Sequence, residues 1–503
     1  MISEPATTQK NICCAQVFFC VLFLAQRIFL EKAVILVHMQ KKKQMKLTFY
    51  GGVGWVTGAN FVVENIPEQN TEKPHRIMID CGMFQGGDDA REKNAMDFHY
   101  DPASIDVLLV THAHADHLGR IPKLVRDGFR GKIYSTDATR DLAPLMFEDS
   151  LKIFDYEKKK YNREPLYSEE DVKKTLSLWK GVPFHSRLDL GQGFSVTLHV
   201  AGHILGSAMM KLSYGSRNML FTGDLGNSPD PILKDTEEVK GIHYLLMESV
   251  YGDRNHEERE KRVEKLKQTI LEVIAKKGAL IIPSFALERT QNLLYTINNL
   301  VESGEIPQIP VFLDSPLSIK ITNVFKKYTH LMNKDVQQKL QTDNDIFAFP
   351  GFVETFSIEE SKAIAHRDNP KIIISSAGMS HAGRIIFHEK NYLSDEKNIL
   401  LFVGYQAVGT LGRIIQDGAK KVKIFGKEIE VKAKIETISG YSAHKDSDHL
   451  LDFVSRMDEN LEKVFVVMGE TKSSEFLATK IRDYLGIEAI VPEQDASVLL
   501  DME

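Results

Sequence analysis

The run His112-Ala113-His114-Ala115-Asp116-His117 constrains this chain more than any other segment, because it places four candidate metal ligands within six residues. It follows Ile105–Val110, an apolar run that predicts a buried strand. His112 and His114 are two positions apart, so an extended backbone directs both imidazoles to one side. The other two ligands come where the chain turns and could face a second ion. Such ligands at a rigid strand end are typical of zinc sites. The alternative is a polar loop with chance histidines.

Three further polar residues also stand at the ends of predicted strands. Phe194–Val200 leads to His203, Asn218–Phe221 leads to Asp224, and the strand that begins at Arg76 ends at Asp80. Taken singly, each could be a structural turn or cap residue. Strand ends can converge at one edge of a sheet, where loops carry chemistry on a rigid scaffold. We therefore predict that His203 and Asp224 join the histidine-rich run at a metal site, with Asp80 behind its ligands.

Length and composition predict a large, ordinary globular protein. The 503 residues suggest about three structural units, and 43% hydrophobic with 26% charged residues is normal for such proteins. The formal net charge of −6 excludes a generally basic nucleic-acid binder, although not a local basic groove. The four cysteines show no disulfide framework, which favours a reducing, cytoplasmic location.

The first 44 residues differ from the rest of the chain. Ile12–Ala25 is largely apolar, but it is too short for a comfortable membrane helix and no cleavage site stands out. We interpret residues 1–44 as an extension outside the folded protein, which then starts at Met45, where Lys46–Gly52 predicts a first strand and turn. A membrane or export segment is the alternative, and we expect a chain begun at Met45 to fold.

From Met45 onward, short strands alternate with helical patterns, which predicts a mixed α/β class. We expect helices over Asp141–Tyr161, Glu169–Lys180 and about Glu257–Lys277. The last of these opens a second α/β segment.

The order of these motifs resembles that of the metallo-β-lactamase superfamily. Two later motifs narrow the resemblance to its β-CASP branch of RNA-processing zinc nucleases. Met247–Arg254 resembles the first extra motif, with Glu248 as its acid, and Gly440–His444 resembles the second, with His444 as its histidine. The resemblance extends from Met45 to the C-terminus.

The resemblance implies a four-layer αβ/βα sandwich with an inserted β-CASP α/β domain. Residues 45–249 would form the first part of the metallo-β-lactamase domain, 250–403 the β-CASP domain, and 404–503 the returning C-terminal part. One zinc ion would bind His112, His114 and His203, a second would bind Asp116 and His117, and Asp224 would bridge both. Nucleic acid would enter the cleft between the domains.

The expected reaction is hydrolysis of an RNA phosphodiester by a metal-bound hydroxide, with Asp116, Glu248 and His444 as catalytic residues. Paired cations can clamp an in-line displacement at an anionic phosphate. The leaving sugar oxygen needs a proton, which His444 could donate if Glu248 orients it. The alternatives are a surface histidine in a turn and a carboxylate that simply ends a strand. RNA is the expected partner; single-stranded DNA and a homodimer stay open, and no small-molecule cofactor is expected.

A glycine-rich stretch offers candidate substrate contacts. Ser376, Gly378 and Gly383 could form a backbone amide nest for a phosphate, with Arg384 and Arg413 as its charged partners. A turn-rich connector is the alternative. Histidines that occupy no motif position, among them His199 and His388, we interpret as structural.

One position departs from the family pattern. The strand Val464–Val467 leads to Met468-Gly469-Glu470, where the family places a histidine that binds the second zinc. A thioether is a soft ligand that suits zinc poorly. We therefore expect one tightly bound zinc and a weaker second ion, zinc or manganese. We therefore keep two alternatives to a ribonuclease. One is a catalytically weak RNA-binding or scaffold protein that has lost metal ions, and the other is a small-molecule metallo-hydrolase. Endonuclease and exonuclease action stay open.

Overall fold

The computed structural model describes Met1 and residues 43–67, 73–86, 89–256, 259–404, 406–407, 409–457 and 459–503. The expected N-terminal extension therefore lies outside the described residues from position 2 to 42. The first strand begins at Gln44, one residue before Met45, and Gln44 pairs with Asp501. Among the described residues, no helix is both long and apolar enough to cross a membrane.

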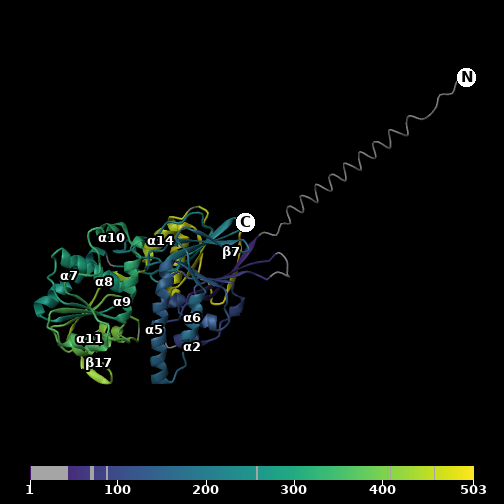
Figure 1. The fold of residues 1–503 in the computed structure, drawn as a ribbon. Helices are drawn as coiled ribbons and strands as arrows, with labels where there is room; N and C mark the ends of the chain where they lie inside the picture. Colours follow the sequence, from purple (N-terminus) through teal and green to yellow (C-terminus); the bar gives the residue numbers. More distant parts are fainter. Residues whose placement is uncertain are drawn as a thin grey trace.

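Two seven-stranded sheets form the centre of one lobe (Figure 1). The first has the order β22(Ser497–Asp501), β1(Gln44–Gly51), β2(Asn60–Asn65), β3(Arg76–Ile79), β4(Val107–Leu109), β5(Lys132–Ser135), β6(Trp179–Gly181). The second has the order β21(Glu488–Ile490), β20(Lys463–Val467), β11(Tyr244–Glu248), β10(Arg217–Phe221), β9(Ala208–Tyr214), β8(Phe194–Val200), β7(Arg187–Gly191). Alternate residues of both sheets, such as Phe49 and Leu198, share one apolar cluster, so the sheets pack face to face.

Helices cover the outer faces of this sheet pair. The long helix α5(Asp137–Tyr161) and α6(Glu169–Ser177) bury Leu142, Phe147 and Val172 beside the first sheet. The helices α14(Ser447–Ser455) and α15(Thr471–Leu485) bury apolar residues against the second sheet. The layers are therefore helix, sheet, sheet and helix, which confirms the expected four-layer sandwich.

A third sheet forms the other lobe, whose helices appear in teal and green in Figure 1. Its order is β14(Phe352–Glu354), β13(Val311–Asp314), β15(Lys371–Ser375), β12(Ala279–Pro283), β16(Ile399–Phe402), β19(Lys434–Thr437), and all its neighbouring strands are parallel. Helix α7(Arg259–Lys276) precedes the first of these strands, and the helices between them include α8(Arg289–Glu302), α9(Pro316–Lys327) and α12(Ile385–Tyr392). This alternation of parallel strands and helices confirms the inserted α/β domain.

The third sheet extends beyond residue 403, where the sequence led us to end the inserted domain. Strand β19 pairs with β16 in parallel, from Ile399 opposite Lys434 to Phe402 opposite Thr437. The hairpin of β17(Lys421–Ile424) and β18(Lys427–Glu430) precedes it. The chain thus returns to the first lobe only after residue 437.

The two lobes share one continuous apolar cluster. It includes Leu142 and Phe147 of the first lobe and Leu280 and Phe325 of the second. At the junction, Leu233 forms an isolated β-bridge with Met332. The lobes are therefore joined by buried side chains as well as by the chain itself.

Most predicted elements are present, with shifted ends. Helix α5 begins at Asp137, four residues earlier than expected, because the Thr136 hydroxyl accepts a hydrogen bond from the Thr139 amide and caps it. Helix α6 ends at Ser177 instead of Lys180, because Trp179 enters strand β6 and donates its indole hydrogen to Ser135 Oγ.

The topology brings the predicted ligands to one edge of the sheet pair. Strands β3 and β4 are parallel, so the segments that follow them, with Asp80 and His112, leave the first sheet at the same end. In the second sheet β9 is antiparallel to both β8 and β10, so the turns that carry His203 and Asp224 also share one end. Strand β11 is parallel to β10 and brings Glu248 to that edge.

Candidate metal centre

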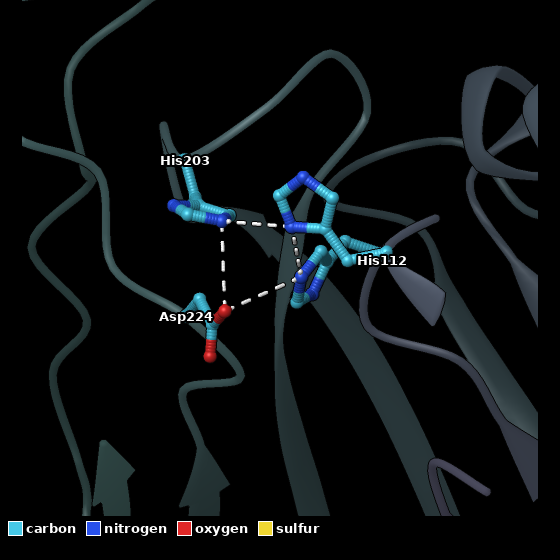
Figure 2. Close-up of side chains that lie close together, drawn as sticks. His112, His203 and Asp224 are labelled. Carbon is cyan, nitrogen blue, oxygen red and sulfur yellow. Dashed lines mark hydrogen bonds and ion pairs between the residues drawn. The ribbon is translucent and has the colours of Figure 1, made fainter. Parts of the chain in front are cut away.

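The first group of ligand atoms comprises His112, His114, His203 and Asp224, and all four lie within 4.8 Å of one another. Asp224 Oδ2 lies 3.4 Å from His112 Nε2 and 3.5 Å from His203 Nε2. Figure 2 shows His112 and His203 turning their ring nitrogens toward this carboxylate. His114 completes the group, with Nδ1 3.2 Å from His112 Nε2 and 3.1 Å from His203 Nε2.

The second group comprises Asp116, His117 and Asp224, again within 4.8 Å. Asp224 Oδ1 lies 3.2 Å from His117 Nε2, and Asp116 Oδ2 lies 3.9 Å from the same nitrogen. Asp224 therefore presents one oxygen to each group. The two groups are adjacent and share this carboxylate, and its role as a bridge between two zinc ions stays a prediction.

These side chains fit divalent cations. Burial lowers the pKa of His112, His114 and His203, so their rings stay neutral and can offer a lone pair to a metal. His117 Nε2 and Asp224 Oδ1 are buried and form no hydrogen bond with the rest of the described chain. Burying polar atoms that form no hydrogen bond costs free energy unless a cation contacts them. Burial would also lower the pKa of His117, but the charges of Asp224 and Asp80 raise it, so a cation in the second group would displace a proton there. The three neutral imidazoles and the carboxylates of Asp116 and Asp224 are consistent with divalent metal ions.

Asp80 lies behind the ligands. Its Oδ2 accepts hydrogen bonds from His117 Nδ1 at 2.8 Å and from Thr111 Oγ1 at 2.7 Å, and its Oδ1 accepts the Thr111 amide at 2.8 Å. His112 Nδ1 lies 3.0 Å from Thr111 Oγ1. Because both Nδ1 atoms are engaged, the Nε2 atoms of His112 and His117 face the ligand groups. The sequence pointed to Asp80, whereas the linking hydroxyl of Thr111 carried no distinguishing signal.

A pair of a buried glutamate and a partly exposed histidine adjoins the first group. Glu248 ends strand β11 and is 1% exposed, and both of its oxygens lie 3.2 Å from His444 Nδ1. The Leu225 amide donates to Glu248 Oε1 at 2.6 Å and so fixes the carboxylate. Burial would lower the pKa of His444, but the charges of Glu248, Asp224 and Asp116 raise it to about 9. His444 therefore holds a proton at neutral pH.

Local contacts hold the backbone of His444. Residue 444 forms an isolated β-bridge with Gly226, and its carbonyl accepts a hydrogen bond from His256 Nε2 at 2.9 Å. The preceding carbonyl, that of Ala443, accepts from His203 Nδ1 at 3.2 Å. The loop that contains residues 443 and 444 is thus hydrogen-bonded to His203 of the first group. No sequence motif pointed to His256.

The glycine-rich stretch forms a tightly packed loop. Ser376 Oγ lies 2.9 Å from Ser315 Oγ. A Cβ on Gly378 would lie 2.8 Å from the ring of Phe285. At Gly383, φ is +78° and a Cβ would lie 2.5 Å from the Ser376 carbonyl oxygen, so glycine is required there. These contacts do not test whether the loop binds a substrate phosphate, which stays a prediction.

The two predicted phosphate-binding arginines are engaged elsewhere. Arg384 donates to Asp314 Oδ1 at 2.7 Å and to the Phe356 carbonyl at 2.6 Å. Asp314 also accepts from His388 at 2.7 Å, so Arg384 belongs to a buried network under the loop. Arg413 forms an exposed ion pair with Asp417, with 2.9 Å from Nε to each oxygen. The structure thus gives Arg384 a supporting contact, and the phosphate contacts expected of both arginines stay predictions.

Met468 lies just after strand β20 with φ at +49° and an almost fully buried side chain. Its amide donates to the Gly52 carbonyl at 2.6 Å. A Cβ on Gly52 would lie 2.5 Å from Met468 Sδ, and the side chain joins the apolar cluster between the sheets. The methionine therefore packs as a core residue beside the first strand.

Three family descriptions match consecutive parts of the chain. Residues 73–284 match the Metallo-beta-lactamase superfamily, residues 290–415 match the Beta-Casp domain, and residues 428–492 match the Zn-dependent metallo-hydrolase RNA specificity domain.

Related proteins cover most of the chain. Ribonuclease TTHA0252 of Thermus thermophilus is 34% identical over 395 residues, which are 78% of this chain and 88% of that protein. The transcription termination factors FttA of Methanocaldococcus jannaschii and Methanosarcina mazei are 30% and 31% identical, over 89% of this chain and 70% of each relative. A crystal structure of a protein of unknown function from Enterococcus faecalis covers 91% of this chain and 100% of its own, with a TM-score of 0.53 and 13% identity. That last likeness concerns the fold alone.

Replacing Asp224 should remove more metal than replacing His114. Asp224→Ala takes a ligand from both groups, whereas His114→Ala weakens only the first. Elemental analysis of zinc-loaded protein after gel filtration measures this difference. His99→Ala is the matched control, because His99 is an exposed histidine paired with Asp495 outside both groups. Unchanged metal content in Asp224→Ala would contradict the assignment.

Proposed function

Because the chain belongs to the β-CASP family of the metallo-β-lactamase superfamily, we propose that it is a zinc-dependent ribonuclease that hydrolyses phosphodiester bonds of RNA. One observation carries the proposal. Asp224 joins two ligand groups, and the pair of Glu248 and His444 lies beside them. A two-cation site next to a protonated histidine is the arrangement that phosphodiester hydrolysis needs.

The donor set favours zinc in the first group. Three neutral imidazoles and one carboxylate suit zinc better than the hard cations that prefer oxygen ligands alone. When bound, zinc ions lower the pKa of a coordinated water so that it can attack phosphorus, and they offset the negative charge of the phosphate. Asp116 and Asp224 offer carboxylate oxygens in the second group, which also suits manganese.

His444 is the proposed proton donor to the leaving sugar oxygen. Its Nδ1 faces Glu248 and its pKa is raised to about 9, so its ring carries two protons at neutral pH. Glu248 is a positioning residue in this scheme, since it contacts the histidine and the Leu225 amide. It keeps the imidazole both oriented and charged.

RNA is the proposed substrate on two grounds. Residues 428–492 match an RNA specificity domain, and this segment includes His444 and strand β20. A relative that is 34% identical is named as a ribonuclease. The hydroxyl cluster of Ser376 with Ser315 and Ser318 is our proposed neutral contact for a substrate phosphate.

The direct test is cleavage of a labelled RNA by the purified chain. We expect cleavage that stops on chelation, returns with zinc, and is absent from Asp224→Ala. A single-stranded DNA of the same sequence measures the preference for RNA. Binding of RNA without cleavage at full zinc loading would instead favour a scaffold protein, and absence of both binding and cleavage would favour a small-molecule hydrolase.

Loss of the acid pair should slow cleavage without removing metal. Glu248→Gln and His444→Ala should each reduce turnover by ~10²–10⁴-fold, the usual contribution of a general acid. If the two side chains act as one unit, the double variant should be little slower than either single variant. Additive losses, or a fall in bound zinc, would argue for separate roles or for a ligand role.

The pH dependence of the cleavage rate tests whether Glu248 controls the proton of His444. A proton donor with a raised pKa is active below that pKa, and its activity falls as the pH rises through it. Glu248→Gln removes the charge that raises the pKa of His444, so the alkaline limb of the rate profile should move to lower pH. An unmoved alkaline limb would show that Glu248 does not control this proton.

We propose that the second ion is held less tightly than the first. Met468 follows β20 at the point where Val467 pairs with Glu248, so this position lies at the edge that carries the ligands. A thioether there supplies no good zinc ligand. Metal titration should therefore give one tight and one weaker ion.

Met468→His should tighten the second site, and histidine tolerates the left-handed backbone of this position better than most residues. Met468→Leu is the control of similar volume without a ligand atom, and should titrate as the parent chain does. Two equally tight ions in the parent, unchanged by Met468→His, would show that another residue completes the shell.

A further inference from the structure

A second cluster of ligand-type side chains lies apart from the groups that share Asp224. It comprises His185, His199 and Glu237, whose ligand atoms lie within 4.8 Å of one another. They come from three segments: the turn between β6 and β7, strand β8, and the segment that follows β10. No ligand is common to this cluster and the first two groups.

The spacing of the cluster suits a metal ion. His185 Nε2 lies 2.9 Å from each oxygen of Glu237, and His199 Nδ1 lies 3.3 Å from Glu237 Oε2. In a tetrahedral zinc site with bonds of about 2.1 Å, neighbouring ligand atoms are ~3.4 Å apart. The two nitrogens can thus share an ion with the carboxylate after small side-chain rotations.

The backbone holds two of the three side chains in place. His199 alternates with core-facing Val196 and Leu198 along β8, so it leaves the sheet on the outer side. Glu237 Oε2 accepts the Val200 amide at 3.2 Å, and the Glu237 amide donates to the Val200 carbonyl at 3.0 Å. Glu237 is therefore fixed to the end of β8.

The carboxylate is charged at all ordinary pH values. Burial would raise the pKa of Glu237, but hydrogen bonds from His199, His185 and the Val200 amide lower it to about 2. It offers an anionic oxygen to any cation that reaches it. With two imidazoles beside it, the donor set is that of zinc and related first-row ions rather than of magnesium or calcium.

The cluster is open to solvent. The side chain of His185 is 59% exposed, and that of Glu237 is 31% exposed. Both residues line a cavity of about 420 Å³ that Tyr328 and His330 of the second lobe also line. An ion can therefore enter from the solvent and keep water on its remaining positions.

We propose that His185, His199 and Glu237 form an additional binding site for a divalent transition-metal ion of the zinc class. The ion would join the β6–β7 turn and the Glu237 segment to the end of β8. The Thr236 hydroxyl donates to the Ala201 carbonyl at 2.8 Å, and His203 follows two residues later. The site thus braces the segment that carries a ligand of the metal centre.

The test is the zinc content of His185→Gln, because the side chain of His185 is exposed and its replacement leaves the packed core unchanged. Protein loaded with zinc and then gel-filtered should hold one ion fewer than the parent chain, by elemental analysis. Glu237→Gln should lose the same ion. His330→Gln is the matched control, since His330 lines the same cavity outside the cluster.

Two further measurements separate this site from the metal centre. The rise in melting temperature on adding zinc should be smaller in His185→Gln, whereas the melting temperatures of both chains in chelator should agree. RNA cleavage at saturating zinc should persist in His185→Gln, since it keeps every ligand of the groups that share Asp224. Equal zinc content and equal zinc-induced stabilisation in parent and His185→Gln would show that the cluster is an ion pair only.

Discussion

The carboxylate of Asp224 is the constraint on which the rest of the site depends. It is 2% exposed and its oxygens face two separate sets of imidazoles, so it must be held where both sheets end. A buried charge is tolerated only when it is paired or bound to a cation. The pairing of β10 with β9 and β11, and the packing of the first sheet over them, bring these partners together. The ends of β3, β4, β8, β10 and β11 thus meet at the edge that holds this side chain.

The sequence predicted this part of the structure well, because each ligand directly follows an apolar strand and local pattern determines where such a strand ends. The sequence did not reveal contacts between residues that are far apart along the chain. The neighbourhood of Arg384 in the sequence does not reveal its contact with Asp314, which lies seventy positions away. We ended the inserted domain at residue 403, whereas its sheet also includes the short strand β19, which pairs with β16. His185 and Glu237 belong to no motif, and only the folded chain brings them together.

The acid–histidine pair combines two residues that are far apart in the sequence. Glu248 comes from the first passage through the sheet pair, and His444 returns after the inserted lobe. His203 donates to the carbonyl before His444, so a proposed metal ligand and the proposed proton donor are mechanically connected. Correct placement of the returning loop is therefore a condition for both metal binding and proton transfer.

The apolar cluster that runs through both lobes has a consequence for folding. Leu142 and Phe147 pack in the same cluster as Leu280 and Phe325, and Leu233 meets Met332 at the junction. Unfolding either lobe by itself would expose the apolar surface of the other, at ~25 cal/mol for each Å² uncovered. The lobes are consequently one cooperative unit, in which local opening of the insertion is penalised. Such a chain acquires its active arrangement only when synthesis has reached the C-terminal strand.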